Sequence, residues 1–237
     1  MAAVAMLEAK DVSFVYQTKY QRTQALKGVS CTFSPGKFYA IVGPSGCGKT
    51  TFLSLLAGLG TPTVGEILFD GQPLKQIGFE KYRRENVSVI YQNFNLFPLL
   101  TVLENVLFPM KVERRNRAAC KERARELLQS VGLTSQQEKK FPAMLSGGEQ
   151  QRVAIARALA SQAKVLLADE PTGNLDTENG RAVLDILKGL VSQQGRCLIM
   201  VTHDLTIASQ ADVVVHMQDG AIVSVQEQWN PKEGGVL

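Results

Sequence analysis

The octapeptide GPSGCGKT at residues 43–50 constrains this chain more than any other feature of its sequence. It matches the pattern GxxxxGK[ST], in which glycines let backbone N–H groups approach nucleotide phosphates, the lysine adds a positive charge and the last hydroxyl binds Mg²⁺. An apolar run at 38–42 precedes it, and apolar side chains at helical spacing follow over 50–59. This order predicts a buried strand, a phosphate-binding loop and a helix whose N-terminus favours an anion. The sequence therefore predicts a nucleotide site.

The rest of the chain alternates between strand and helix patterns. Buried strands are predicted by apolar runs at 165–168, 197–201 and 213–215, and a helix is predicted at 177–190. Alternation of this kind is typical of an α/β fold with a mainly parallel sheet and helices on both faces. Two-residue periodicity near the start of the chain, at 12–16 and 27–33, predicts further short strands.

Residues 93–160 carry no clear strand pattern and are expected to be mostly helical. Helices are predicted at 102–111, 117–131 and 146–160. With 237 residues the chain has room for one large α/β domain with a modest insert, but not for two full domains. We therefore expect a single domain over 1–237. Its core is expected at about 1–92 and 161–226, its helical subdomain at about 93–160 and a short tail at 227–237.

Composition excludes several classes of protein. Apolar residues make up 45% and charged residues 20% of the chain, as in ordinary globular proteins. No apolar run approaches the roughly 18 residues of a membrane-spanning helix, and the N-terminus lacks the pattern of a secretion signal. The four cysteines contain no CxxC pair, which argues against a metal cage and against a disulfide framework. We expect a chain that stays in the cytoplasm.

Two adjacent acids, Asp169 and Glu170, follow the apolar run at 165–168. We expect this run to lie beside the strand that leads into the phosphate loop. One acid would then hold Mg²⁺ through water while the next polarises an attacking water, as phosphoryl transfer to water requires. The alternative is a strand that simply ends in two solvated acids.

A second glycine-containing turn, Ser146-Gly147-Gly148-Glu149, opens the helical pattern at 146–160. A serine at the N-cap and a glutamate three residues later form a capping box, which accounts for Ser146 and Glu149. The two glycines need another reason, because each weakens a helix start by about 1 kcal/mol relative to alanine. We expect an anion to bind their bare backbone N–H groups.

Several other residues have a functional and an ordinary explanation. His203 follows the strand pattern at 197–201, where it could donate a hydrogen bond to a phosphate or be a surface histidine. Gln92 and Asp176 are, by themselves, ordinary loop residues. Tyr16 by itself favours the core over a position that stacks on a base.

Cys47 lies inside the phosphate loop, close to Lys49 and to a helix N-terminus. Both neighbours favour a thiolate. We therefore predict that alkylation of the protein inhibits it and that bound ATP protects it.

Six motifs in a fixed order make the chain, from about residue 7 to residue 225, resemble the ATP-binding subunit of an ABC transporter. They are GPSGCGKT at 43–50, Tyr-Gln at 91–92, LSGGEQQR at 145–152, VLLADE at 165–170, NLD at 174–176 and THD at 202–204. The resemblance implies a RecA-like P-loop core with an N-terminal antiparallel β subdomain and an inserted α-helical subdomain. It also implies a head-to-tail dimer, in which the second glycine turn of one copy caps the γ-phosphate held by Lys49 of the other.

The resemblance also assigns roles to individual residues. Glu170 would be the general base, His203 would contact the γ-phosphate, Asp176 would reach across the dimer and Tyr16 would stack on adenine. The catalytic set would be Glu170, His203, Gln92 and Asp176, and Mg²⁺ would be served by Thr50, Gln92 and Asp169. ATP would be held by Tyr16, Gly43, Pro44, Ser45, Gly46, Cys47, Gly48, Lys49, Thr50 and Thr51, and by Ser146, Gly147, Gly148 and Glu149 of the partner copy.

The wording ADEPTGNLD at 168–176 most resembles the branch of macrolide and peptide exporters, lipoprotein-releasing systems and the cell-division ATPase. It implies transmembrane permease subunits as partners and a place at the cytoplasmic face of the inner membrane, with no direct contact to the transported substrate. The apolar stretch at 93–98 would border the groove for a permease segment. The expected function is ATP hydrolysis that drives export or extraction of a peptide, lipoprotein or drug-like substrate. The alternative is an ATPase that transmits force through a permease-like partner without transport.

Other ATPases with this cassette fit less well. Chromosome and DNA-repair ATPases insert a long coiled coil, for which the interval from 92 to 145 has neither the length nor sustained heptads. Translation factors of this kind carry two cassettes in one chain. Basic residues at 114–125 alternate with glutamates, as on a solvated helix face, so no nucleic-acid partner is expected.

Overall fold

The computed structural model describes residues 5–112 and 117–228. Its strands are β1 Leu7–Gln17, β2 Arg22–Phe33, β3 Phe38–Val42, β4 Val64–Phe69, β5 Gln72–Pro73, β6 Val87–Ile90, β7 Val165–Asp169, β8 Cys197–Val201, β9 Val213–Gln218 and β10 Ala221–Glu227. Its helices are α1 Lys49–Leu56, α2 Leu74–Ile77, α3 Phe79–Glu85, α4 Val102–Val112, α5 Arg117–Ser130, the 3-10 turn η1 Pro142–Met144, α6 Gly147–Ala160, α7 Thr177–Gln194 and α8 Leu205–Ala208.

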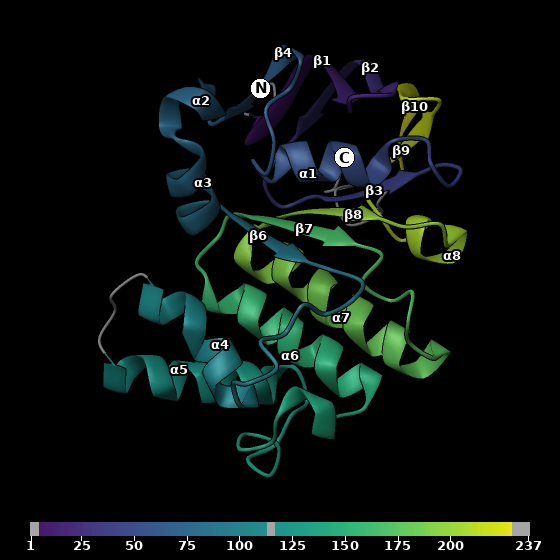
Figure 1. The fold of residues 1–237 in the computed structure, drawn as a ribbon. Helices are drawn as coiled ribbons and strands as arrows, with labels where there is room; N and C mark the ends of the chain where they lie inside the picture. Colours follow the sequence, from purple (N-terminus) through teal and green to yellow (C-terminus); the bar gives the residue numbers. More distant parts are fainter. Residues whose placement is uncertain (1–4, 113–116, 229–237) are drawn as a thin grey trace, which may run out of the picture.

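The strands form two sheets, with α1 between them (Figure 1). The first is antiparallel and has the order β2-β1-β4-β5. The second has the order β10-β9-β3-β8-β7-β6; its strands from β9 to β6 pair in parallel, and β10 is antiparallel to β9. The predicted α/β class, with a mainly parallel sheet and antiparallel strands near the N-terminus, is confirmed.

Strand β3 shows why the parallel sheet needs continuous apolar runs. Phe38, Ala40 and Val42 belong to one hydrophobic cluster, whereas Tyr39 and Ile41 belong to the other. Successive strand residues point to opposite faces, so both faces of β3 are buried. The first cluster continues into α4, α5, α6 and α7, and the second into α1 and the antiparallel sheet (Figure 1).

The acid-bearing strand β7 is not a neighbour of β3, because β8 lies between them. The expectation that the two strands lie side by side is therefore wrong. The acids still lie near the phosphate loop, because parallel strands end at one edge of the sheet and β7 ends with Asp169 at the same edge as that loop.

Two predicted helices end at different residues in the structure. The helix expected at 50–59 stops at Leu56, because Gly58 adopts a positive φ of 68° and the N–H of Leu59 turns back to the carbonyl of Ser54 at 3.0 Å. The helix expected at 177–190 continues to Gln194 and ends at Gly195, which has φ of 63°. A left-handed glycine after the last turn ends both helices.

The segment from 61 to 90 contains elements that the sequence did not predict, namely β4, β5, β6, α2 and α3. Strand β6 has four residues, of which the middle two are only partly buried. Such a short run carries little periodicity of its own, and its place at the edge of the sheet comes from pairing with β7.

The three helices predicted within 93–160 are confirmed as α4, α5 and α6. They lie on the side of the parallel sheet opposite α1 (Figure 1). Subdomain bounds at 93 and 160 stay a prediction. Of the basic residues expected on α5, Arg123 forms an exposed ion pair with Glu126 at 2.8 Å, while Arg114 and Arg115 lie outside the described residues.

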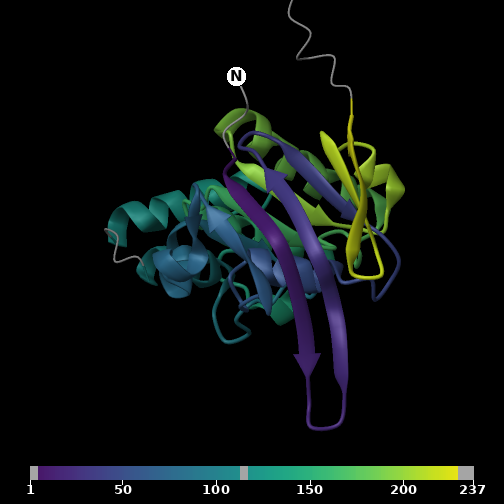
Figure 2. The ribbon, with the colours of Figure 1, turned by 90° about the horizontal axis from the view of Figure 1, so that it is seen from above.

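Strands β1 and β2 form a long hairpin that projects from the body of the molecule (Figure 2). Near its tip the hairpin carries Tyr16. Among residues 5–112 and 117–228, no helix has both the length and the apolar character needed to cross a bilayer.

Candidate active site

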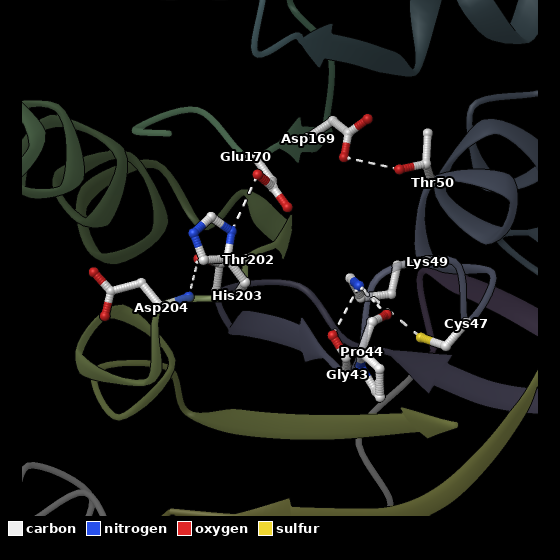
Figure 3. Close-up of polar contacts among 10 residues, drawn as sticks. All are labelled: Gly43, Pro44, Cys47, Lys49, Thr50, Asp169, Glu170, Thr202, His203 and Asp204. Carbon is white, nitrogen blue, oxygen red and sulfur yellow. Dashed lines mark hydrogen bonds and ion pairs between the residues drawn. The ribbon is translucent and has the colours of Figure 1, made fainter. Parts of the chain in front are cut away.

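The phosphate loop joins β3 to α1, and Lys49 organises it. The Lys49 ammonium donates hydrogen bonds to the carbonyl oxygens of Gly43 at 2.9 Å and Pro44 at 2.8 Å (Figure 3). The side chain is only 7% exposed. Its positive charge is therefore held inside the loop by backbone carbonyls, at the N-terminus of α1, where an anion is favoured.

Two loop glycines are required by packing against neighbouring backbone. A Cβ on Gly43 would stand 2.1 Å from the carbonyl oxygen of Met217, and one on Gly48 would stand 2.6 Å from that of Ala25. Gly48 also has φ of 102°, in the left-handed region that L side chains rarely adopt. The loop backbone is thus fitted to β9 and to the β1–β2 hairpin, in addition to any ligand.

Thr50 and Asp169 meet across the edge of the sheet. The Thr50 hydroxyl donates to Oδ1 of Asp169 at 3.3 Å (Figure 3). Burial raises the pKa of the Asp169 carboxyl, partly offset by this hydrogen bond, which lowers it. A hydroxyl and a carboxylate supply the oxygen donors that Mg²⁺ prefers in proteins. The donor set therefore suits Mg²⁺.

Glu170 follows in a strained conformation. Its φ of 44° is unusual for a residue with a side chain, and its N–H is held by the carbonyl of Val201 at 3.0 Å. Its Oε2 lies 3.1 Å from Nδ1 of His203, which follows β8 (Figure 3). The structure thus brings together the acid and the histidine that the sequence placed at this edge.

One cavity of about 870 Å³ is lined by Lys49, Thr50, Glu170 and His203, together with residues of the hairpin and of the β9–β10 turn. Tyr16 stands at its rim, 51% exposed, with its hydroxyl 3.2 Å from Oγ1 of Thr51. The interpretation of Tyr16 as a core residue is therefore wrong. An exposed ring at the mouth of a phosphate-binding cavity is suited to stacking on a base.

Cys47 is buried, with 6% of its surface exposed, and its Sγ lies 4.0 Å from Nζ of Lys49. The expected proximity of thiol and ammonium is confirmed. Protection of this thiol by ATP stays a prediction, and burial favours slow alkylation even before a nucleotide binds.

The second glycine turn begins α6 with a complete capping box. Oγ of Ser146 accepts from the N–H of Glu149 at 3.2 Å, and Oε2 of Glu149 accepts from the N–H of Ser146 at 2.8 Å. That second bond lowers the pKa of the Glu149 carboxyl. The cap predicted from the sequence is confirmed.

The two glycines of this turn have different surroundings. A Cβ on Gly148 would stand 2.8 Å from Cγ of Asn179, so this glycine is needed for packing against α7. A Cβ on exposed Gly147 would meet its nearest atoms, in Asn174 and Phe94, at an ordinary 3.9 Å. Packing against Asn179 thus gives Gly148 a reason within the chain, whereas the described residues supply no such reason for Gly147. Binding of an anion by both glycines stays a prediction.

The residues that line the 870 Å³ cavity do not include the Ser146 turn within the described chain. One copy therefore contains the lysine loop, Glu170 and His203 at one cavity, and a glycine turn outside it. The two devices seen in the sequence do not face each other in a single chain.

Gln92 and Asp176 lie outside helices and strands, and neither lines this cavity. The carbonyl of Gln92 accepts from Nδ2 of Asn174 at 3.1 Å. Asp176 is the N-cap of α7: it accepts from the N–H of Asn179 at 2.9 Å and from its Nδ2 at 2.7 Å. These bonds lower the pKa of Asp176. Asp176 therefore caps a helix within its own chain, apart from the contact across a dimer that the resemblance implies for it.

Sequence reasoning missed two residues that organise the site. Asn179 joins α6 to α7, because its Oδ1 also accepts from Arg152 at 2.7 Å. The spacing Asp-x-x-Asn at a helix start could have indicated it. Arg157 binds the loop after Gln92 through two backbone carbonyls. Nothing in the sequence indicated that contact.

The chain is similar in sequence to known proteins over most of its length. The sequence model of the family described as "ABC transporter" matches residues 26–173. An uncharacterized ABC transporter ATP-binding protein, MJ1508 of Methanocaldococcus jannaschii, is 44% identical over 223 residues, which are 93% of this chain and 99% of that protein. The lipoprotein-releasing system ATP-binding protein LolD of Syntrophotalea carbinolica is 43% identical over 221 residues, 92% of this chain and 97% of its own.

A solved structure has the same fold. The dimeric structure of MJ0796, a bacterial ABC transporter cassette, superimposes with a TM-score of 0.88 at 36% identity, covering 94% of this chain and 98% of that one. A second structure of that cassette is a dimer in a post-hydrolysis state with ADP and Pi, with the same TM-score and coverage.

Proposed function

This chain belongs to the ABC transporter family and is an ATPase of that family, and we propose that two copies hydrolyse ATP together, head to tail, to drive a membrane permease. The observation that carries the proposal is the pair of helix N-termini that one chain keeps apart. One has a lysine loop at a cavity, and the other has an exposed glycine at which an added Cβ would meet no atom of the described residues closer than 3.9 Å.

Within one chain, the loop Gly43 to Thr51 would hold the phosphates. The Lys49 ammonium would exchange its bonds to the carbonyls of Gly43 and Pro44 for phosphate oxygens, as the stronger charge-assisted partners. Ser45, Gly46, Cys47 and Gly48 would contribute backbone N–H groups. Tyr16 would stack on the adenine at the rim of the cavity.

Mg²⁺ would be held by Thr50 and Asp169, with Gln92 as a further ligand. When bound, the ion neutralises charge on the transferring phosphoryl group. The hydrogen bond between Thr50 and Asp169 supports this assignment, because it places the hydroxyl and the carboxylate side by side.

Glu170 would accept a proton from the attacking water, and His203 would donate a hydrogen bond to the γ-phosphate. The 3.1 Å contact between Nδ1 of His203 and Oε2 of Glu170 supports this pairing, because the histidine can orient the carboxylate that it touches. Both side chains line the cavity that contains Lys49.

The partner copy would close the site. Ser146 and the N–H groups of Gly147 and Gly148 would bind the γ-phosphate from the opposite side, with Glu149 holding the cap, and Asp176 would lie at the contact between copies. The exposure of Ser146 and Gly147 supports this arrangement. The MJ0796 cassettes, which are dimers in the solved structures, support it as well.

A permease would dock on the helical side. A cavity of about 560 Å³ there is lined by, among others, Val89, Phe97, Phe108, Pro109, Val112 and Arg157. Phe97 and Phe108 are partly exposed, and their ring centroids are 4.5 Å apart. Exposed aromatic pairs of this kind mark interaction sites. We assign the groove to an amphipathic segment of the permease, which would place the chain at the cytoplasmic face of the inner membrane.

The transported substrate would be a peptide, a lipoprotein or a drug-like molecule that is exported or extracted from the membrane. The 43% identity to a lipoprotein-releasing protein over nearly the whole chain supports this class. It favours transport over an ATPase that only transmits force. The division into a core and a helical subdomain at about 93–160 belongs to the same proposal.

Dimerisation of a hydrolysis-deficient variant tests the proposal. With Mg²⁺ and ATP, Glu170→Gln should shift from monomer to dimer in sedimentation, because ATP is held but not consumed. Adding Ser146→Arg in the same chain should abolish the dimer while nucleotide binding to the monomer persists. A Glu170→Gln chain that stays monomeric at all concentrations, or a double variant that no longer binds ATP, would contradict the head-to-tail site.

A further inference from the structure

The loop that follows Gln92 is held in a strained conformation. Two consecutive residues with side chains, Phe94 and Asn95, have φ of 59° and 47°. The left-handed conformation is disfavoured for Phe94 and less so for Asn95, and two such residues in a row persist only where the surroundings hold them. No glycine relieves the turn.

Arg157 of α6 supplies the contacts that hold it. Its guanidinium donates to the carbonyl of Asn95 at 2.7 Å and to that of Phe94 at 3.0 Å, so it bridges the two strained residues. It also lies 5.7 Å from the ring of Phe97. Burial lowers the pKa of this guanidinium, and hydrogen bonds from a charged, partly desolvated donor are strong.

The same loop carries Gln92 and lies beside the Ser146 turn. The N–H of Phe94 bonds to the carbonyl of Tyr91 at 3.2 Å, so Gln92 lies inside the turn that Arg157 closes. On the other side, Cζ of the Phe94 ring lies 3.9 Å from the position of a Cβ on Gly147. A change in the turn would move Gln92 and would alter the surface beside the Ser146 turn.

We propose that Arg157 is a positioning residue, which holds the Phe94-Asn95 turn left-handed and thereby fixes the position of Gln92, which lies inside that turn. We call the contact of Arg157 with the Phe94-Asn95 turn the latch. Arg157 and Asn95 also line the 560 Å³ groove, so an occupant of that groove touches the latch directly. The inference rests on the proposed role of Gln92 in serving Mg²⁺.

Hydrogen exchange tests the latch without any enzyme assay. Arg157→Ala should let the amides of residues 93–97 exchange about tenfold faster, because the strained turn opens more often. The matched control is Arg125→Ala, which removes another helical-region arginine, bound to Glu138 at 3.1 Å and away from this loop. Equal exchange over 93–97 in both variants would overturn the proposal. If Arg157→Ala does not fold, Arg157→Lys, which can bond only one carbonyl well, should show an intermediate rate.

Kinetics test the link to Gln92. Arg157→Ala should lower kcat about tenfold and raise the Mg²⁺ concentration needed for half-maximal rate, with the KM for ATP changed less than about twofold. In a Gln92→Ala background the same change should have little further effect, because the residue being positioned is gone. Additive losses would overturn the proposal. An inactive wild-type chain would contradict the proposed function instead, and the exchange experiment would still decide on the latch.

A rescue separates strain from a general loss of stability. Asn95→Gly removes the steric cost of the left-handed conformation at one position. Combined with Arg157→Ala, it should recover at least half of the lost kcat and slow the exchange over 93–97. An effect of Arg157 through overall packing would not be rescued, so a double variant no better than Arg157→Ala would count against the latch.

Discussion

The phosphate loop and the Ser146 turn both place glycines at the start of a helix, yet their surroundings differ. Helix α1 has no side-chain cap, and its loop is held from within by Lys49 and from outside by the backbone near Ala25 and Met217. Helix α6 has a complete capping box, but Gly147 beside the cap meets nothing closely. Contacts among the described residues therefore account for two glycines of the phosphate loop. In the Ser146 turn they account for the capping box and for Gly148, but not for Gly147.

The largest expected effect comes from changing the proposed base, Glu170, at the cavity that contains Lys49. Glu170→Gln should lower the rate of ATP hydrolysis by about a hundredfold or more and leave ATP affinity unchanged, because the amide cannot accept the proton of the attacking water. Steady-state ATPase rates and a nucleotide-binding titration measure the two quantities. Glu126→Gln, on the exposed face of α5, is the control and should behave as wild type. Normal turnover by Glu170→Gln would show that the base lies elsewhere.

The next largest effect is expected at Gly147, where activity and stability should change in opposite directions. Gly147→Ala should lower ATPase activity about tenfold, because the methyl group would intrude on a phosphate bound from the partner copy. Its free energy of unfolding should rise by up to about 1 kcal/mol, because alanine favours a helix start over glycine and the site is open within the chain. Loss of activity with gain of stability is the expected result in ATPase and denaturant-unfolding measurements. A destabilised Gly147→Ala would point to a role within one chain.

The neighbouring glycine should give the opposite stability result. Gly148→Ala places a methyl group against Asn179, which Asp176 and Arg152 hold in place. We expect a loss of about 1–2 kcal/mol, as in other overpacked sites, or a fall in Tm of several degrees. Thermal unfolding compares the two alanine variants directly. Equal stability of both would remove the distinction drawn between these glycines.

The smallest expected effect is the pH dependence of the free energy of unfolding that Asp169 contributes. Burial raises the pKa of Asp169, so the unfolded chain releases this proton before the folded chain does as pH rises. The free energy of unfolding of the nucleotide-free protein should therefore fall as pH rises from the ordinary aspartate pKa through the raised value. Asp169→Asn should remove this part of the pH dependence in thermal unfolding. An unchanged pH profile would show that Asp169 does not contribute it.

Much of the fold could be predicted, because most of its helices and strands have a recognisable pattern within their own residues. Residues 38–42 and 197–201 are buried on both faces, so every position had to be apolar, and both strands lie where the sequence placed them. Strand β6 and the order of β7, β8 and β3 could not be predicted, because pairing between strands depends on residues that are far apart in the sequence.

The candidate site was predicted unevenly for the same reason. Lys49, Asp169 and His203 lie at or after the carboxyl ends of apolar strands, so the sequence predicted that they share one edge of the sheet. Tyr16 was misplaced in the core, because alternation in a hairpin does not say how far the hairpin projects. Asn179 and Arg157 escaped notice, because each acts through contacts with distant backbone or side chains.

The sequence by itself determined the phosphate loop, the capping box and the apolar strands, since each depends on residues within a few positions of one another. Only the tertiary structure decided which glycine is needed for packing, since that depends on whether Asn179 from a separate helix stands against it. It likewise decided that the strained turn after Gln92 is held by an arginine more than sixty residues away, a contact that local propensity does not encode.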